Sequence, residues 1–280
     1  MQRILSTYRF VNQPLGAALL AEIAQAGFSA VEVFCASQHF SYRDAQRVRE
    51  LGDALGEYRL GLHSVHSPTD RDRSPGRESG VVISISDPER IRRLDAVDEI
   101  KRVLDVAEQV PFQYLIQHIG HGRQAADARK LDAAFTSLES LSMFAKARGV
   151  TIALENTPDE LGAPASLQHF ITDTHLHDLK LCFDIGHAHI EEGVQASFDA
   201  MRERVVSTHI HDNHGDKDEH LLPFEGNIDW GAALAGFAGA LIELPFVFEI
   251  KARAGAAAVP ELAAIRDACD KLVEQFETQK

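Results

Sequence analysis

Short apolar runs alternate along the chain with longer segments in which apolar residues recur every three or four positions. Apolar runs of this length predict buried β-strands, whereas the longer period predicts amphipathic helices. We expect strands near 3–10, 30–35, 59–66, 113–119, 151–156, 179–184, 205–211 and 244–250. We expect helices over 15–26, 44–57, 88–109, 126–148, 166–176, 195–203, 229–240 and 259–277.

This regular alternation predicts parallel strands joined by right-handed crossovers. A doubly wound sheet and a (β/α)8 barrel both satisfy that order, and eight strand–helix units favour the barrel. The length of 280 residues suits such a barrel, which usually has about 250. We therefore predict an α/β protein, a (β/α)8 TIM barrel forming a single domain over residues 1–280. The long polar segment 67–87 is expected to be a lid, a binding loop or disordered.

Four predicted strands end on a side chain that can bind a metal ion. These side chains are Glu155, Asp184, His209 and Glu249. Because alternate residues of a strand share a face, each ligand lies on the same face as the small residue two positions before it. Those residues are Ala153, Cys182, Ser207 and Val247, whereas Leu154, Phe183 and Phe248 face the helices. Loops after barrel strands build the active site, so we expect the four ligands to meet there.

Five further candidate ligands follow the predicted strands. They are His66, His118, His187, Asp218 and His220. So many carboxylates and imidazoles at one end of a barrel require a cation, because an apolar core does not tolerate them uncompensated. Some neighbouring side chains are alternatives, namely His63 for His66, His121 for His118 and Asp216 for Asp218.

A structural role is the alternative to metal binding at these positions. Glu155 and Glu249 could form buried ion pairs with Lys180 or Lys251. Asp184 and His187 could be helix-capping and loop-packing groups instead of metal ligands. The position of each carboxylate at the end of a strand favours the metal site.

Composition restricts the partners and the compartment. With 28 basic and 42 acidic residues, the formal net charge of −14 repels polyanions and argues against nucleic acid as a partner. Cys35, Cys182 and Cys269 show no CxxC spacing, which favours reduced thiols in the cytoplasm. No apolar stretch approaches the about 18 residues of a membrane span, and the first residues carry no apolar signal region. We expect a soluble cytoplasmic protein with no membrane contact.

Several motifs together resemble one protein superfamily. The matching segments are Leu154-Glu155-Asn156, Phe183-Asp184-Ile185-Gly186-His187, His209-Ile210-His211-Asp212, Asp218-Glu219-His220 and Glu225-Gly226-Asn227-Ile228-Asp229-Trp230. With Glu249 after the last strand, nearly the whole chain is similar to the xylose isomerase-like TIM barrel superfamily. This superfamily joins sugar phosphate isomerases and epimerases with endonuclease IV.

The resemblance implies two overlapping ligand sets. Ketose 3-epimerases of the superfamily hold one divalent ion with a set that matches Glu155, Asp184, His209 and Glu249. Endonuclease IV holds three zinc ions with nine ligands, and the further matches are His66, His118, His187, Asp218 and His220. One to three divalent ions are therefore expected, and carboxylates with imidazole suit zinc, manganese or magnesium.

The first functional hypothesis is a metal-dependent isomerase or epimerase of a sugar or sugar phosphate. Glu155 and Glu249 would be the catalytic pair that removes and returns a proton beside the carbonyl, through an enediolate. His211 and Asp212 would orient His209.

The alternatives are a multi-metal phosphodiesterase of the endonuclease IV kind, acting on abasic DNA, and an inactive metal-binding barrel. Endonuclease IV carries a DNA wedge after its first histidine, where this chain has Ser67-Pro68-Thr69-Asp70, and this departure favours small sugars. The arginine with which the epimerases hold substrate is absent from 212–220, so their substrate contacts do not transfer. A homo-oligomer is left open.

Overall fold

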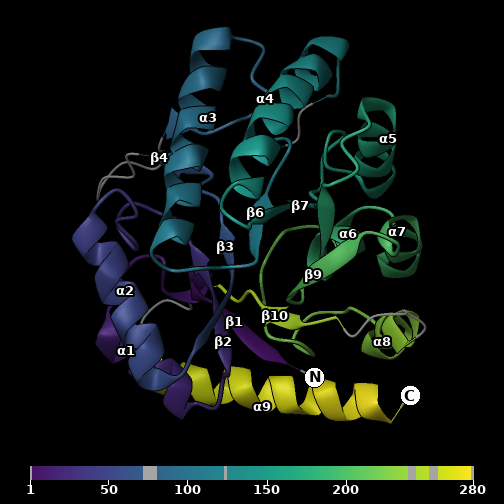
Figure 1. The fold of residues 1–280 in the computed structure, drawn as a ribbon. Coiled ribbons are helices and arrows are strands. Elements are labelled where there is room, and N and C mark those ends of the chain that lie inside the picture. The colour runs from purple at the N-terminus through teal and green to yellow at the C-terminus, as the bar shows by residue number, and fades with distance from the viewer. Residues whose placement is uncertain (1, 72–80, 123–124, 239–243, 252–257, 279–280) are drawn as a thin grey trace.

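The computed structural model describes residues 2–71, 81–122, 125–238, 244–251 and 258–278. Eight parallel strands close into a barrel in the order β1-β10-β9-β8-β7-β6-β3-β2 (Figure 1). They are β1 (Arg3–Ser6), β2 (Ala30–Phe34), β3 (Gly61–His66), β6 (Tyr114–Gln117), β7 (Thr151–Glu155), β8 (Lys180–Asp184), β9 (Val205–Ile210) and β10 (Phe246–Phe248). The predicted (β/α)8 TIM barrel is confirmed, and each predicted strand overlaps one strand of the barrel.

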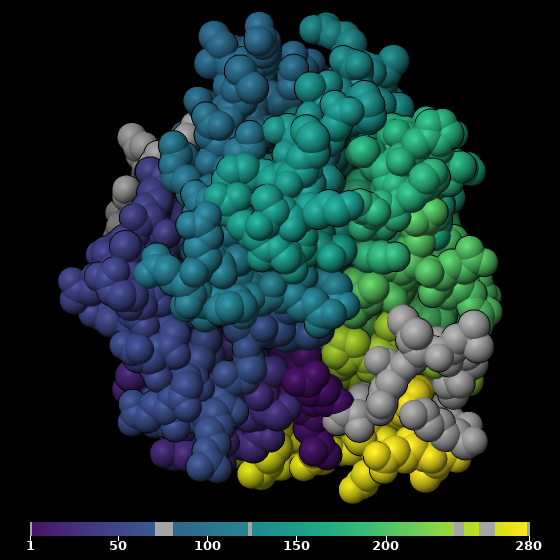
Figure 2. Space-filling model, viewed as in Figure 1, coloured from purple at the N-terminus to yellow at the C-terminus, as the bar shows by residue number. Residues whose placement is uncertain are grey.

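Helices surround the barrel (Figure 1). They are α1 (Ala17–Gln25), α2 (Ala45–Tyr58), α3 (Arg90–Leu104), α4 (Ala128–Lys146), α5 (Pro164–Thr174), α6 (Ile185–Ile190), α7 (Val194–Met201), α8 (Trp230–Ala238) and α9 (Ala258–Glu277). In the space-filling view, the blue and teal segments that include α3 and α4 form the upper part of this face (Figure 2). Among the described residues, no helix has both the length and the apolar character needed to cross a membrane.

The two faces of each strand meet different surroundings, as the alternation of residues predicts. Inside the barrel, Ile116, Ala153 and Cys182 form one small apolar cluster. On the other face, Leu154 and Phe183 belong to the large core between strands and helices. Because Ala153 and Cys182 are small, the barrel has room above them for the longer polar side chains at the ends of β7 and β8.

The structure differs from the expected elements in three places. The expected strand 3–10 ends at Ser6, because the chain then turns into a 3-10 helix (Thr7–Phe10) whose Tyr8 N–H is bonded to Ser6 Oγ. The short helix α6 was not expected between β8 and α7. The segment 67–87 contains an antiparallel pair, β4 (Asp70–Arg71) and β5 (Val81–Val82), and its middle lies outside the described residues.

Candidate metal centre

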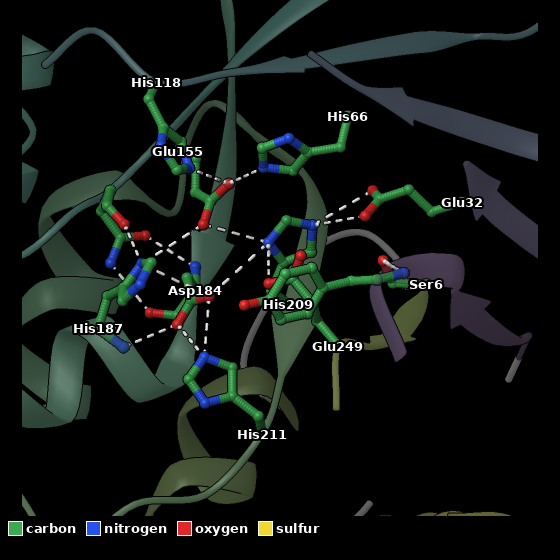
Figure 3. Close-up of polar contacts among 12 residues, drawn as sticks. Ser6, Glu32, His66, His118, Glu155, Asp184, His187, His209, His211 and Glu249 are labelled. Carbon is green, nitrogen blue, oxygen red and sulfur yellow. Dashed lines mark hydrogen bonds and ion pairs between the residues drawn. The ribbon is translucent and has the colours of Figure 1, made fainter. Parts of the chain in front are cut away.

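A cavity of about 150 Å³ opens at the carboxyl ends of the barrel strands. Seven of the predicted ligands line it, namely His66, His118, Glu155, His187, Asp218, His220 and Glu249. The other two, Asp184 and His209, are fully buried beside them. The structure therefore brings all nine predicted side chains together, in three groups that could each hold an ion (Figure 3).

The first group consists of Glu155, Asp184, His209 and Glu249, with ligand atoms within 4.8 Å of one another. Nδ1 of His209 lies 3.2 Å from Oε1 of Glu155 and 3.5 Å from Oε2 of Glu249. Oδ2 of Asp184 is 3.7 Å from the same nitrogen. In the described part of the chain this buried nitrogen has no hydrogen-bond partner. An unpartnered imidazole nitrogen facing three carboxylates is a donor set that fits a divalent ion.

Local structure holds Asp184 firmly in this group. Asp184 pairs with His209 across β8 and β9. Its Oδ1 also accepts a hydrogen bond of 2.7 Å from the backbone N–H of His187, so it caps α6 as well. The side-chain amide of Asn156 bonds both the N–H and the carbonyl of Asp184, at 2.8 and 2.9 Å. These bonds leave Oδ2 toward His209 in a fixed position.

The second group consists of His66, His118 and Glu155, so it shares Glu155 with the first. Oε2 of Glu155 lies 3.2 Å from Nε2 of His66 and 3.1 Å from Nε2 of His118. Its other oxygen, Oε1, lies 3.2 Å from Nδ1 of His209 and 3.4 Å from Nδ1 of His187. Glu155 therefore joins the two groups through both of its carboxylate oxygens.

The third group consists of His187, Asp218 and His220 together with His211. Oδ2 of Asp218 lies 3.4 Å from Nε2 of His187 and 2.9 Å from Nε2 of His220. The rings of His211 and His220 stack with their centroids 4.0 Å apart. His211 is thus a fourth member that the sequence did not place among the candidate ligands.

The neighbouring alternatives lie outside these groups. Nε2 of His63 faces Ser207 Oγ, at 3.2 Å. Within the described ranges, His63, His121 and Asp216 belong to none of the three groups. The structure therefore favours His66, His118 and Asp218 as the convergent side chains.

The two glutamates do not form the lysine ion pairs that were the alternative to metal binding. Glu155 pairs with histidines, and Glu249 pairs with His209 and His220. Among the described residues, neither Lys180 nor Lys251 pairs with either glutamate. Their negative charge is therefore balanced by imidazoles, or by any cation that the imidazoles and carboxylates bind together.

Two side chains have different contacts from those expected of them. Nε2 of His211 lies 3.0 Å from Oδ1 of Asp184 and so orients that carboxylate, not His209. Asp212 accepts hydrogen bonds from the indole Nε1 of Trp230 at 2.9 Å and from the backbone of Phe224 at 3.0 Å. Asp212 therefore stabilises the loop before α8.

Glu32 is a site residue that the sequence analysis missed. It is the middle residue of β2 and is fully buried. Its oxygens lie 3.1 and 3.2 Å from Nε2 of His209, and it accepts a bond of 2.7 Å from Ser64 Oγ. The available signal was a single glutamate between Val31 and Val33, because an acidic residue inside a buried strand needs a partner.

Mutual charge sets the protonation of the cluster. Burial alone lowers the pKa of a histidine and raises that of a carboxyl group. Against that effect, the charge of His209 holds the pKa of Glu155 well below its usual value. Asp184 likewise holds the pKa of His187 well above its usual value, and the bond to Asp218 raises the pKa of His220 to about 9. The side chains thus form an array of carboxylates and imidazolium groups, whose protons a divalent ion can replace.

One wall of the cavity is aromatic. Tyr8 and Phe34 line it with their ring centroids 4.9 Å apart, and Phe34 stacks on His66 at 4.6 Å. No lysine or arginine of the described segments lines the cavity. Any anionic group of a ligand would therefore have to meet imidazolium groups or a bound cation.

Comparison with known proteins identifies the family to which this chain belongs. A closed barrel with a polar centre at the carboxyl ends of its strands is the usual arrangement of a TIM-barrel enzyme. Residues 20–275 match a family model described as xylose isomerase-like TIM barrel. The chain belongs to this family, as its motifs predicted.

Two sequence relatives cover most of this chain. An uncharacterized protein of Methanocaldococcus jannaschii is 28% identical over 75% of this chain and 71% of its own. A probable endonuclease 4 of Natronomonas pharaonis is 27% identical over 61% of this chain and 68% of its own.

Solved structures share the fold at lower identity. A D-tagatose 3-epimerase-like protein superposes with a TM-score of 0.81 at 22% identity, covering 100% of this chain and 99% of that one. The IOLI protein, solved with a bound zinc atom, superposes with a TM-score of 0.72 at 15% identity, covering 100% and 98%.

Proposed function

We propose that the protein is a divalent-metal-dependent isomerase or epimerase of small sugars or sugar phosphates. The observation that carries this proposal is the position of Glu155 and Glu249. Their carboxylates approach the same nitrogen of His209 from two strands, at 3.2 and 3.5 Å, and both line one small cavity. The D-tagatose 3-epimerase-like protein supports this class, and the zinc atom of the IOLI protein supports a divalent ion in the same fold.

Glu155, Asp184, His209 and Glu249 would hold the ion. Bound there, it would supply a Lewis acid that polarises a substrate carbonyl. Asp184 is fixed by the backbone of α6, by Asn156 and by His211. It would therefore act as a ligand and leave the proton transfers to the glutamates.

The surroundings of the two glutamates divide the proton transfers between them. Both ion pairs of Glu249 involve Oε2, which leaves Oε1 to take the proton from the carbon beside the carbonyl. Oε2 of Glu155 meets His66 and His118, whose imidazoles can replace a proton that Glu155 gives to the opposite face of the enediolate. The aromatic wall of Tyr8 and Phe34 would cover the apolar side of the sugar.

The test is proton exchange at carbon. In deuterated water, the wild-type protein with zinc or manganese should exchange the proton beside the carbonyl of at least one compound in a panel of ketoses and ketose phosphates, followed by proton NMR. Glu249→Gln should abolish this exchange, whereas Glu274→Gln, on the exposed face of α9, should retain it. Absence of exchange across the panel would reject the proposal.

A second candidate function, phosphodiester hydrolysis by a metal cluster, is favoured by one specific observation. Both oxygens of Glu155 are in contact with the imidazoles of two groups, as expected of a carboxylate that bridges two ions. The probable endonuclease 4 relative supports this candidate, whereas the acidic net charge and the lack of lysine or arginine in the described cavity wall oppose it.

The number of ions and the substrate separate the two candidates. Zinc titration that ends at one tightly bound equivalent would favour the epimerase. Two or three equivalents, together with metal-dependent nicking of abasic duplex DNA, would favour the phosphodiesterase. Metal binding without turnover of any compound would leave the inactive metal-binding barrel.

A further inference from the structure

We propose that Glu32 is a positioning residue, which fixes the tautomer of His209 and thereby directs the lone pair of Nδ1 at the ion site. The inference rests on the proposed metal site but assigns a residue that is not itself a ligand. Among the residues that the structure describes, Glu32 does not line the cavity and contacts the three candidate ligand groups only through His209.

The contact between Glu32 and His209 crosses the interior of the barrel. Glu32 lies on β2 and His209 on β9, and β1 and β10 separate these strands in the barrel order. Both side chains are fully buried. Ser64, on the neighbouring strand β3, donates a hydrogen bond of 2.7 Å to Oε2 of Glu32 and holds the carboxylate in place. Figure 3 shows Glu32 on one side of the His209 ring and Glu155 and Asp184 on the other.

This geometry selects one form of the imidazole. A carboxylate only accepts hydrogen bonds, so Nε2 of His209 must carry the proton that it shares with Glu32, at 3.1 to 3.2 Å. Once a divalent ion has displaced the second proton of the imidazolium, Nδ1 carries the lone pair. That nitrogen has no hydrogen-bond partner in the described chain and faces Glu155, Glu249 and Asp184. The opposite tautomer would set the lone pair of Nε2 against the carboxylate of Glu32.

A purely structural role does not explain a carboxylate at this position. Glu32 adds a fourth buried acidic group to an acidic site, and its only ion pair within the described residues is with His209. Burying a carboxylate without a lysine or arginine partner is costly, and a neutral residue would fill β2 without that cost. A carboxylate behind a ligating histidine, in contrast, orients the ring and increases its basicity as a ligand.

Glu32→Gln tests the proposal on the full-length protein, because glutamine keeps the size and one acceptor oxygen but removes the charge. We expect zinc affinity, measured by competition with a chromophoric chelator, to fall about 10- to 100-fold. Glu99→Gln is the matched control. Glu99 is equally buried but bonds Tyr42, Arg43 and Arg102, none of which lines the cavity, so its variant should lose stability without losing zinc affinity.

The tautomer is a separate readout that needs no variant. In the zinc-loaded wild-type protein, nitrogen-15 NMR should show a proton on Nε2 of His209 and none on Nδ1. In Glu32→Gln the Nε2 proton signal should shift upfield, because its acceptor is no longer charged. A proton on Nδ1 in the wild type, or equal zinc affinity of wild type and Glu32→Gln, would overturn the inference and leave the proposed function standing. A wild-type protein that binds no zinc would overturn both.

Discussion

At the residue scale, Glu155 and Glu249 are the same amino acid at equivalent strand ends, yet they meet different surroundings. Within the described segments, both oxygens of Glu155 contact imidazoles, four in all, whereas Glu249 meets two imidazoles through a single oxygen. Glu155 is thus the common member of two candidate ion groups, and Glu249 belongs to one. The same substitution at the two positions should therefore have different effects.

We predict that Glu249→Gln mainly removes catalysis and that Glu155→Gln mainly removes metal. Loss of a general base costs about a hundred- to ten-thousand-fold in rate, so Glu249→Gln should bind metal more weakly but stop exchanging carbon-bound protons. Glu155→Gln should lose ions from both groups that share it. Elemental analysis of the two purified variants checks this, and equal metal contents with equal residual exchange would contradict the asymmetry.

Protonation of the histidines predicts that metal uptake depends on pH. Burial lowers the pKa of His220, but the hydrogen bond and charge of Asp218 raise it to about 9, so the metal-free ring is protonated at pH 7. An ion must displace that proton. Zinc affinity should therefore rise between pH 6.5 and 9, with release of protons that an indicator dye records in weak buffer.

A matched pair of variants tests whether His220 is a source of the released protons. His220→Gln should reduce the release, whereas His169→Gln, at an exposed position on α5, should leave it unchanged. Zinc affinity that does not vary over this pH range would contradict the imidazolium array of the metal-free centre.

At the scale of elements, the short helix α6 couples packing to the site. Gly186 lies against the ring of His211, and a Cβ at this position would come within 2.0 Å of its Cε1. His211 in turn holds Asp184. A larger residue in α6 must therefore move a side chain that orients a candidate ligand.

We predict that Gly186→Ala destabilises the fold by about 1 to 3 kcal/mol, the usual range for overpacking, and also weakens metal binding. Gly56→Ala is the control, because a Cβ on Gly56, in α2, would meet no other atom within 4 Å, and alanine there favours the helix by up to about 1 kcal/mol. Urea unfolding and zinc competition measure both properties. A Gly186→Ala protein as stable as Gly56→Ala would show that His211 can move freely.

The elements predictable from sequence are those that bury a regular apolar face. The alternation in β7 and β8 correctly placed Ala153 and Cys182 inside and Leu154 and Phe183 outside. The 3-10 helix after β1 and helix α6 were missed, because single side-chain caps, from Ser6 and Asp184, start them without any periodic apolar pattern. Such short elements follow from one hydrogen bond and not from a repeat.

At the scale of the whole molecule, closure of the β-barrel determines which site residues can be predicted from the sequence. Candidate ligands at strand ends could be predicted, since parallel strands bring their carboxyl ends to one rim. Glu32 could not, because its contact with His209 depends on the register and closure of strands that lie far apart in sequence. His211 was placed beside the wrong partner, since strand order alone does not fix which carboxylate a ring meets.

Removal of metal should lower the stability of the entire barrel, because the site ties several strands together. An ion present at about a hundredfold its dissociation constant stabilises the fold by about 2.7 kcal/mol. For a domain of this size, this corresponds to a fall in Tm of about 5 to 10 °C on chelation. Zinc added back in excess of the chelator should restore the original Tm.

The fall in Tm on chelation should be larger at high pH than at low pH, because His220 loses its proton as the pH rises. Its pKa rises from about 6.5 in the unfolded chain to about 9 in the fold. The stability that this group contributes to the metal-free protein is therefore complete below pH 6.5 and is lost as pH rises through 9. A bound ion replaces the proton and removes that loss. Calorimetry at pH 6.5 and 9 should show a larger fall in Tm at pH 9. An unchanged Tm at both values, with no metal in the purified protein, would refute the metal centre.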